Sequence, residues 1–195
     1  MKKTIILATR NAGKLREFNH AFEGTGIVFQ SLLEMPGAPD PEEHGQTYQD
    51  NALIKAREIS AFTGLPTVAD DSGIEIDAMP GELGVKSARV WGDMPYGKIN
   101  AILLDRLKGN PNRGTRYVCA IAYVDPAAGT ERVVQATCEG VIHDRQEGDG
   151  GFGYDPIFFV PEFGKTMAQL PLETKNKISH RAKAMEMLKE ILLHG

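Results

Sequence analysis

Two adjacent carboxylates, Asp70 and Asp71, stand where an apolar run of the sequence gives way to polar residues. The run LPTVA before them is typical of a buried strand, so we expect both side chains at the end of that strand, followed by Ser72 and Gly73. Adjacent carboxylates repel each other, and either solvent or a bound cation keeps both ionised. Hard oxygen ligands of this kind suit Mg²⁺, whereas the alternative is an exposed Asp-Asp turn.

A second pair of carboxylates, Glu42 and Glu43, lies in a loop rich in proline and glycine. On its own such a pair is more typical of a solvated loop than of a metal site. The helix expected after this loop carries Lys55 one turn past Asn51. Lys55 is either a phosphate contact or a surface lysine paired with Glu58.

The stretch ATRNAGKLREF, residues 8–18, joins a short apolar run to a helical pattern. A strand-to-helix turn of this kind directs backbone N–H groups and the positive end of the helix dipole at an anion, and Lys14 adds a positive charge. Ala8 and Leu15 stand where the P-loop motif needs Gly and Ser or Thr, so a Walker ATPase is excluded. An ordinary turn with a solvated lysine is the alternative.

A glycine-rich loop precedes FGYDP, residues 152–156, and its aromatic side chains could cover a planar ligand. A basic cluster stands before and within the first turn of the last expected helix; it consists of Lys175, Lys177, His180 and Arg181. Cations are unfavourable beside a helix N-terminus, so an anion or an acceptor-rich ligand is expected there. Together with the acidic residues and the anion turn, these features predict a nucleoside triphosphate site.

The elements that must position these residues follow from apolar periodicity. We expect strands over 5–8, 27–32, 65–71, 115–125, 131–142 and 156–160, and helices over 47–64, 96–109 and 178–193, after a first helix that carries Leu15, Phe18 and Phe22. The helix over 47–64 should begin with a capping box of Thr47 and Asp50. The expected buried faces of the last three helices are Leu53, Ala56, Ile59 and Phe62; Ile99, Ile102, Leu103 and Leu107; and Ala182, Met185, Leu188 and Leu192. Strands and helices do not alternate strictly, which predicts an α/β protein with mixed strand order.

Length and composition bound the class of protein. At 195 residues without a Ser/Gly-rich or Pro-rich linker, residues 1–195 are expected to form a single domain. Hydrophobic and charged fractions of 42% and 25% exclude disordered and membrane classes, and a net charge of -4 argues against a nucleic acid polymer as partner. The apolar run in MKKTIILATR is too short for a signal peptide or a membrane span, so we expect a cytoplasmic protein. Cys119 and Cys138 lack metal-ligand spacing and should be buried thiols outside any disulfide.

Six motifs in order along nearly the whole chain resemble the inosine/xanthosine triphosphate pyrophosphatase family. They are TRNAGK, the Glu-rich loop before TYQDNALIKA, ADDSG, SARVWG, GGFGYDPIF and KISHR. The resemblance implies an elongated two-lobed α/β fold around a long mixed sheet, with the active site in the cleft between the lobes. It also implies a homodimer that uses Mg²⁺ to hydrolyse ITP, dITP and XTP to the monophosphate and pyrophosphate.

The resemblance implies a role for each matching residue. Thr9, Arg10, Asn11, Ala12, Gly13 and Lys14 match the contacts to the phosphate end. Ser72 matches a substrate contact, and the residues that match contacts to the base and sugar are Phe152, Gly153, Tyr154, Asp155, Lys175, His180 and Arg181. Asp71 matches the metal-associated general base, and the second metal carboxylate falls on Glu43, with Glu42 as the alternative. Many relatives have Gly at the position of Arg10 and Glu at the position of Asp50, and neither change removes a required chemical group.

These residues suggest a mechanism of attack on the triphosphate. Lys14 and Lys55 would act as fixed cations beside the phosphates, and Asp71 would either accept the proton of the attacking water or hold the metal-bound water. Two other functions fit parts of the pattern. One is a pyrophosphatase for modified pyrimidine nucleotides, and the other is a nucleotide sensor that binds without cleaving.

Overall fold

The computed structural model describes residues 2–194, and their strands form one seven-stranded sheet in the order β2-β1-β3-β4-β5-β6-β7. The strands are β1 (Lys3–Leu7), β2 (Ile27–Ser31), β3 (Thr67–Ile76), β4 (Gly114–Asp125), β5 (Thr130–Ile142), β6 (Phe158–Val160) and β7 (Lys165–Thr166). β1 pairs in parallel with β2 and β3, whereas β6 pairs in antiparallel fashion with β5 and β7. The expected α/β class with a mixed sheet is confirmed.

Helices of two kinds accompany the sheet. The α-helices are α1 (Ala12–Ala21), α2 (Tyr48–Thr63), α3 (Tyr96–Arg106), α4 (Leu172–Ile178) and α5 (His180–His194). Short 3-10 helices are Leu32–Glu34, Gly84–Lys86, Pro161–Phe163 and Met167–Gln169. Within residues 2–194, no helix combines the length and apolarity needed to cross a bilayer.

The chain divides into two compact units, and each unit draws on separate parts of the sequence. The first unit contains the residues up to 71, residues 119–136 and the residues from 181 onward. The second contains residues 72–118 and 137–180. β3, β4 and β5 therefore each contribute residues to both units.

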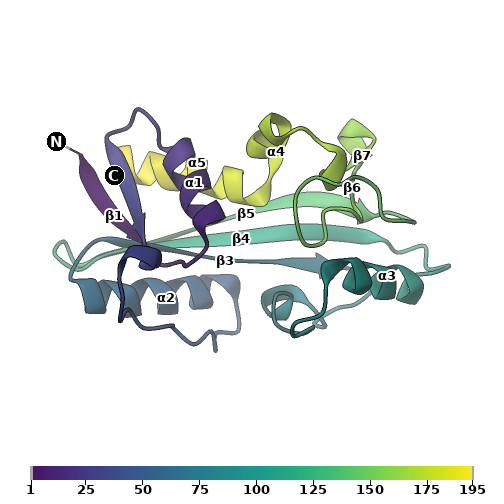
Figure 1. Ribbon diagram of the computed structural model, residues 1–195, viewed down its shortest axis with the longest axis horizontal. Helices are drawn as coiled ribbons and strands as arrows, with labels where there is room; N and C mark the ends of the chain where they lie inside the picture. The colour runs from purple at the N-terminus through teal and green to yellow at the C-terminus, as the bar shows by residue number, and fades with distance from the viewer. Residues whose placement is uncertain (1, 195) are drawn as a thin grey trace. The chain divides into compact units, whose positions relative to one another are not determined.

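In the first unit, helices cover both faces of β1 because successive side chains of a strand point to opposite faces (Figure 1). Ile5 belongs to a core cluster with Phe18 of α1 and Leu188 of α5, and Ile6 belongs to one with Ile59 of α2. These contacts pack α1, α2 and α5 against β1, which pairs with β3, the strand that carries Asp70 and Asp71.

The start of α2 confirms the expected capping box. The Thr47 hydroxyl accepts from the Asp50 N–H at 3.1 Å, and the Asp50 carboxylate accepts from the Thr47 N–H at 3.1 Å. The expected buried face of α2 is wrong at Phe62, which is 52% exposed. The buried stripe is centred on Ala52, Ala56 and Ile59, so Phe62 lies beyond its edge.

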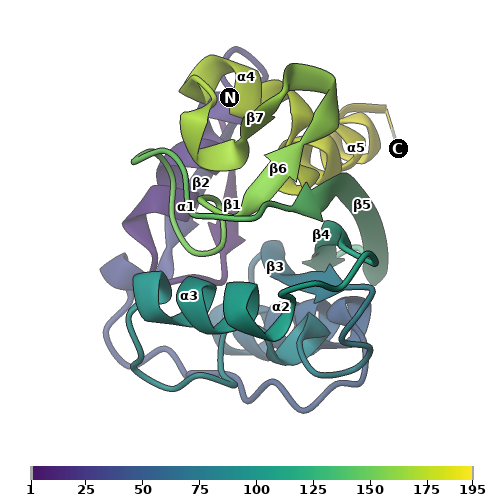
Figure 2. The same cartoon turned by 90° about the vertical axis from the view of Figure 1, so that its right-hand side faces the viewer.

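In the second unit, α3 and α4 lie on opposite sides of the strands (Figure 2). α3 buries Ile99, Leu103 and Leu107 in the core, whereas Ile102, expected to be buried, is 37% exposed. The reason is the same as in α2, because Ile102 lies at the edge of a stripe centred on Leu103.

Helix α4 was not expected from the sequence, and it corrects the placement of the basic cluster. Lys175 and Lys177 lie in the last turn of α4 rather than beside the N-terminus of α5. Cations stabilise the last turn of a helix through its dipole, so these two lysines need no ligand on that ground. The dipole argument applies only to His180 and Arg181, which begin α5.

The strand that carries the paired aspartates is longer than expected. β3 continues through Asp70 and Asp71 to Ile76, so the expected strand end at these residues is wrong. The sequence DDSG reads as a turn, but Gly73 lies inside the strand, where an added side chain would collide with Gly84 and Ser87. Glycine is therefore needed for a close backbone approach and not for a turn.

Two long strands form a hairpin, and the expectation for the two cysteines is confirmed. β4 and β5 are neighbours in the sheet and are joined by residues 126–129, a connection too short for anything but an antiparallel hairpin. Cys119 and Cys138 are both buried, and neither forms a disulfide within residues 2–194.

Candidate active site

The turn before α1 is held by its own side chains. Asn11 is the N-cap residue, and its amide oxygen accepts from the backbone N–H groups of Gly13 at 2.7 Å and Lys14 at 3.3 Å. The Thr9 hydroxyl accepts from the Asn11 N–H at 3.2 Å. Two of the helix N–H groups expected to meet an anion are therefore already paired with Asn11.

Arg10 connects this turn to the acidic loop. Its guanidinium lies 2.9 Å from the Asp40 carboxylate and donates to the Ala38 carbonyl at 2.7 Å. The structure thus places the Arg10 charge on the segment that leads to Glu43, which gives the residue a local role.

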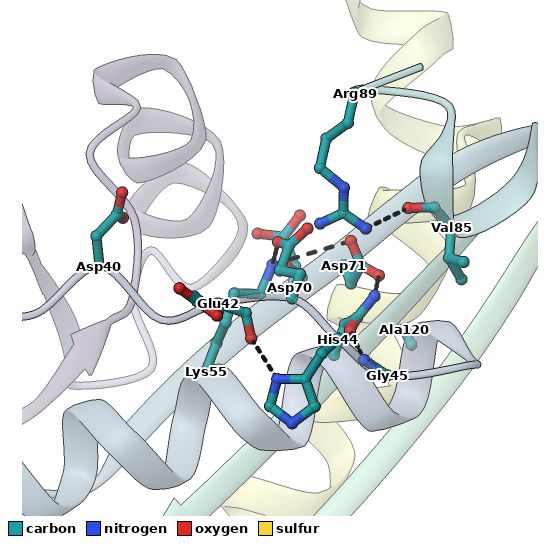
Figure 3. Close-up of polar contacts among 12 residues, drawn as sticks. Asp40, Glu42, His44, Gly45, Lys55, Asp70, Asp71, Val85, Arg89 and Ala120 are labelled. Atoms are coloured by element: carbon teal, nitrogen blue, oxygen red, sulfur yellow. Dashed lines mark hydrogen bonds and ion pairs between the residues drawn. The ribbon is translucent and has the colours of Figure 1, made fainter.

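Lys55 of α2 is the centre of the acidic site. Its ammonium lies 2.5 Å from the Glu43 carboxylate and 3.9 Å from the Asp71 carboxylate, and it donates to the Asp70 carbonyl at 2.7 Å (Figure 3). Burial would lower the pKa of Lys55, but the carboxylates of Asp70, Asp71 and Glu43 outweigh it and raise the pKa. Lys55 is therefore a permanent cation here, and the alternative of a surface lysine paired with Glu58 does not apply.

Asp71 is almost fully buried and is held by Asn51 of α2. The Asn51 amide donates to the Asp71 carboxylate at 3.0 Å and accepts from the Gly45 N–H at 2.8 Å, so one side chain ties Asp71 to the end of the acidic loop. Burial raises the pKa of Asp71 above its usual value, and the opposing effects of Lys55 and Asn51 do not cancel the rise. Such an aspartate is closer to a general base in proton affinity than an ordinary surface aspartate.

Asp70 serves a different set of partners. Its carboxylate lies 2.8 Å from the Lys14 ammonium and 3.6 Å from the Arg181 guanidinium, which also donates to Glu17 at 2.9 Å. Burial would raise the pKa of Asp70, but Lys14, Arg181 and Lys55 hold it far below the usual range. The expectation that solvent or a bound cation keeps both aspartates ionised does not hold for Asp70, whose charge is paired with Lys14 and Arg181. Asp70 and Asp71 have different partners because successive side chains of a strand point to opposite faces.

In the second unit, the carboxylate of Asp155 gathers the expected base-contact residues. It accepts from the Lys175 ammonium at 2.6 Å, the Phe152 N–H at 3.3 Å and the Tyr117 hydroxyl at 3.1 Å. His180 stacks on the Tyr117 ring with the centroids 4.8 Å apart. Phe152 itself is largely exposed.

Tyr154 fixes the other side of this loop. Its hydroxyl donates to the Ser87 carbonyl at 2.6 Å, and burial raises its pKa to about 12. Asn100 of α3 donates to the Gly153 carbonyl at 3.1 Å. The loop over 152–155 is therefore held by side chains of several elements within the same unit.

The structure divides the expected site residues between the two units. The first unit contains Thr9, Arg10, Asn11, Ala12, Gly13, Lys14, Glu43, Lys55, Asp71 and Arg181, and the second contains Ser72, Phe152, Gly153, Tyr154, Asp155, Lys175 and His180. Arg181 was expected with Lys175 but lies beside Asp70 and Glu17. Asn51 and Tyr117 were missed; the one signal for Asn51 was a poor helix former one turn before Lys55.

The acidic site can be tested for its fit to a divalent cation. Glu43 and Asp71 both face the Lys55 ammonium, which shows that the two carboxylates favour a shared positive charge. Glu43 is half-buried and Glu42 is exposed. Among residues 2–194, no group of three or more His, Cys, Asp and Glu side chains is placed to hold a metal ion. Mg²⁺ commonly binds through one or two carboxylates and keeps waters or phosphate oxygens, so these residues fit it.

Known proteins resemble this chain over nearly its full length. The model of the Ham1 family matches residues 5–191. A dITP/XTP pyrophosphatase of Geobacillus kaustophilus is 49% identical over 191 residues, which cover 96% of this chain and 93% of that protein. The structure of a HAM1 protein from Coxiella burnetii superposes with a TM-score of 0.92 at 36% identity and covers 99% of this chain and 100% of that one. A nucleoside-triphosphatase, or dITP/XTP pyrophosphatase, of Mycobacterium abscessus has a TM-score of 0.76 at 41% identity, with coverages of 95% and 98%.

Proposed function

Because the chain belongs to the Ham1 family, we propose that it hydrolyses the deaminated purine nucleotides ITP, dITP and XTP to the monophosphate and pyrophosphate. Removal of these nucleotides would cleanse the nucleotide pool. The observation that carries the proposal is the cluster of Glu43, Lys55 and Asp71, because it combines a fixed cation with two carboxylates in a chain 49% identical to a dITP/XTP pyrophosphatase. A sensor that only binds nucleotides has no need of such a group.

The carboxylates of Glu43 and Asp71 would hold Mg²⁺. When bound there, the ion would neutralise charge on the phosphate oxygens and make the attacking water more acidic. The Lys55 ammonium would then move from Glu43 toward a phosphate oxygen while it stays near Asp71. The raised pKa of Asp71 supports its role as the acceptor of the water's proton.

The phosphates would be bound by the turn before α1 and by two lysines. Lys14 is 24% exposed in its side chain and already in an ion pair with Asp70, so a phosphate would compete with a carboxylate for its ammonium. The residues of the turn that would contribute are Thr9, Arg10, Asn11, Ala12 and Gly13. For Arg10 this contact would require release from Asp40, which is an exposed and therefore weak ion pair.

The base and sugar would be recognised by residues with hydrogen-bond donors and by the aromatic loop. These residues would be Phe152, Gly153, Tyr154, Asp155, Lys175, His180 and Arg181, and Ser72 would be a further substrate contact. Inosine and xanthosine carry an oxygen at position 6 of the purine, where adenine carries an amino group. Donors that face this position would be left unpaired by adenine, and such a mismatch can reach about 10⁴-fold in discrimination. We expect ITP to be cleaved at least about 100-fold more efficiently than ATP.

The proposal also covers the oligomeric state of the enzyme, its location and the form of its substrates. We propose a homodimer, on the resemblance of the six motifs to the pyrophosphatase family, and a cytoplasmic location. Its substrates would be free nucleotides, because a net charge of -4 disfavours a nucleic acid polymer.

The test is release of pyrophosphate from ITP, dITP, XTP, ATP and a modified pyrimidine triphosphate, each with Mg²⁺ and with excess chelator. Asp71→Asn should lower kcat for ITP by at least about 100-fold, because the amide cannot take a proton. Asp105→Asn on the exposed face of α3 is the matched control and should keep the wild-type rate. Binding of ITP without release of pyrophosphate would favour the sensor, and preferential cleavage of the pyrimidine nucleotide would favour the related pyrophosphatase. Full turnover in chelator would refute the role given to Mg²⁺.

A further inference from the structure

Tyr117 of β4 is a buried residue that contacts two of the proposed base-recognition residues, Asp155 and His180. Its ring stacks on Phe158 with the centroids 4.2 Å apart and the planes 15° apart. It also stacks on His180, at 4.8 Å and 21°. Stacked rings at these distances restrict each other's rotation, so the orientation of the His180 imidazole depends on the Tyr117 ring.

The hydroxyl of Tyr117 has a separate partner. It donates to one carboxylate oxygen of Asp155 at 3.1 Å, and the other oxygen accepts from Lys175 at 2.6 Å and from the Phe152 N–H. Burial and the neighbouring Asp155 raise the pKa of Tyr117 well above its usual value. The hydroxyl therefore stays protonated at neutral pH and remains a donor to the carboxylate.

We propose that Tyr117 is a positioning residue that sets base specificity, with its ring orienting His180 and its hydroxyl orienting Asp155. This inference rests on the proposed function, because it assigns the arrangement of the base-recognition residues to one side chain. Through Asp155, the hydroxyl also acts on the Lys175 ammonium and on the start of the 152–155 loop.

The three groups oriented by Tyr117 belong to different elements of the second unit. His180 begins α5, Lys175 lies in the last turn of α4, and Asp155 lies in the glycine-rich loop between β5 and β6. α4 and α5 are separated only by Ser179, whereas the loop that carries Asp155 precedes β6, and Tyr117 extends to all three segments from a central strand. Polar groups discriminate between bases only when they cannot turn away from the wrong base, so a rigid side chain behind them is required.

The two parts of the side chain can be removed one at a time. Tyr117→Phe keeps the ring and removes the hydroxyl, whereas Tyr117→Leu removes both. Tyr123→Phe is the matched control, because Tyr123 is also buried on β4 and its hydroxyl also donates to an aspartate, Asp125, at 2.9 Å. Within residues 2–194, the groups that donate hydrogen bonds to Asp125 belong to Tyr123, Ala127 and Ala128, and none of these is a proposed site residue.

The expected result is a selective loss. In Tyr117→Phe, kcat/KM for ITP should fall by about tenfold, the order of one hydrogen bond to a charged group, while kcat/KM for ATP stays unchanged. The ratio of kcat/KM for ITP to kcat/KM for ATP should fall further in Tyr117→Leu. In Tyr123→Phe this ratio should stay at the wild-type value. If Tyr117 had a merely structural role, kcat/KM would fall by the same factor for ITP and for ATP. Thermal unfolding of each variant identifies any loss that comes from misfolding.

A second measurement does not depend on activity. The ring protons of His180 should show the shielding caused by a stacked aromatic ring in the NMR spectrum of wild type and Tyr117→Phe, and should lose it in Tyr117→Leu. An unchanged His180 resonance in Tyr117→Leu would overturn the role of the ring. If the wild type prefers ITP over ATP and Tyr117→Phe keeps the same ratio of kcat/KM values, the role of the hydroxyl is overturned, whereas the role of the ring is not. Absence of ITP cleavage in wild type would instead refute the proposed function, and the specificity role with it.

Discussion

Replacing Asp70 with asparagine should destabilise the protein strongly. Asp70 is 3% exposed, and its carboxylate is the partner of the Lys14 ammonium at 2.8 Å and lies 3.6 Å from the Arg181 guanidinium. Loss of one partner from a buried ion pair costs about 3–5 kcal/mol, because the other charge stays buried without compensation. Lys14 is 24% exposed and can turn to solvent, and Arg181 keeps Glu17. We therefore expect a loss near the lower end, about 3 kcal/mol.

The assay is urea unfolding at pH 7, with the free energy of unfolding taken from linear extrapolation. Asp40→Asn is the matched control, because Asp40 also pairs with an arginine at 2.9 Å but its side chain is 94% exposed. The control should leave the free energy of unfolding close to the wild-type value, since exposed ion pairs contribute little. Equal losses in the two variants would refute the reasoning that burial sets the strength of the Asp70 interactions.

Unfolding of wild type and Asp70→Asn at different pH values gives a second test. The pKa of Asp70 is depressed in the folded state, so its contribution to stability is present above the unfolded pKa, ordinarily 3.8, and is lost as pH falls toward the folded pKa. The difference in free energy of unfolding between wild type and Asp70→Asn should thus be constant from pH 8 to about pH 5 and shrink below the unfolded value. A difference that shrinks between pH 7 and pH 5 would contradict the depressed pKa.

Two other predictions concern local structure. Thr47→Ala removes the capping box of α2 and should lower the free energy of unfolding by about 1 kcal/mol, measured by urea unfolding. Gly151→Ala combines a positive φ of 79° with a collision against Asp155 and Lys175, whereas Gly24→Ala has a φ of 80° in open space. Gly151→Ala should lower the free energy of unfolding by about 1–3 kcal/mol more than Gly24→Ala does, and this difference measures the collision. Equal losses of free energy in the two variants would show that only backbone strain matters.

The elements that the sequence predicted well are those whose signals are local. The capping box of α2 and the apolar strand β1 depend on residues within a few positions of each other, and both are confirmed. Helix α4 was missed because it has seven residues, too few to show apolar periodicity, and follows Pro171 without a capping side chain. The exposure of Phe62 was missed because it depends on how the stripe of α2 meets the sheet.

The partners of the site residues were much harder to predict than the residues themselves. The basic character of Arg181 is visible in the sequence, but its pairing with Glu17 joins positions 164 residues apart. Tyr117 reads as an ordinary strand residue, and its contact with Asp155 spans 38 residues. Pairing between residues so far apart leaves no local pattern in the sequence. The acidic and basic residues could therefore be predicted from the sequence, but their partners could not.

The two adjacent aspartates show what that arrangement adds to the chemistry. Asp70 and Asp71 have the same side chain and nearly the same burial, yet the pKa of Asp70 is depressed and that of Asp71 is raised. The difference arises because strand alternation turns Asp70 toward Lys14 and Arg181, whereas Asp71 faces one lysine that Glu43 shares. Pairs of titratable groups whose pKa values are pushed apart commonly divide the work of a site. Asp70 thus has the properties of a permanent charge that holds Lys14 in place, and Asp71 those of a group able to take up a proton.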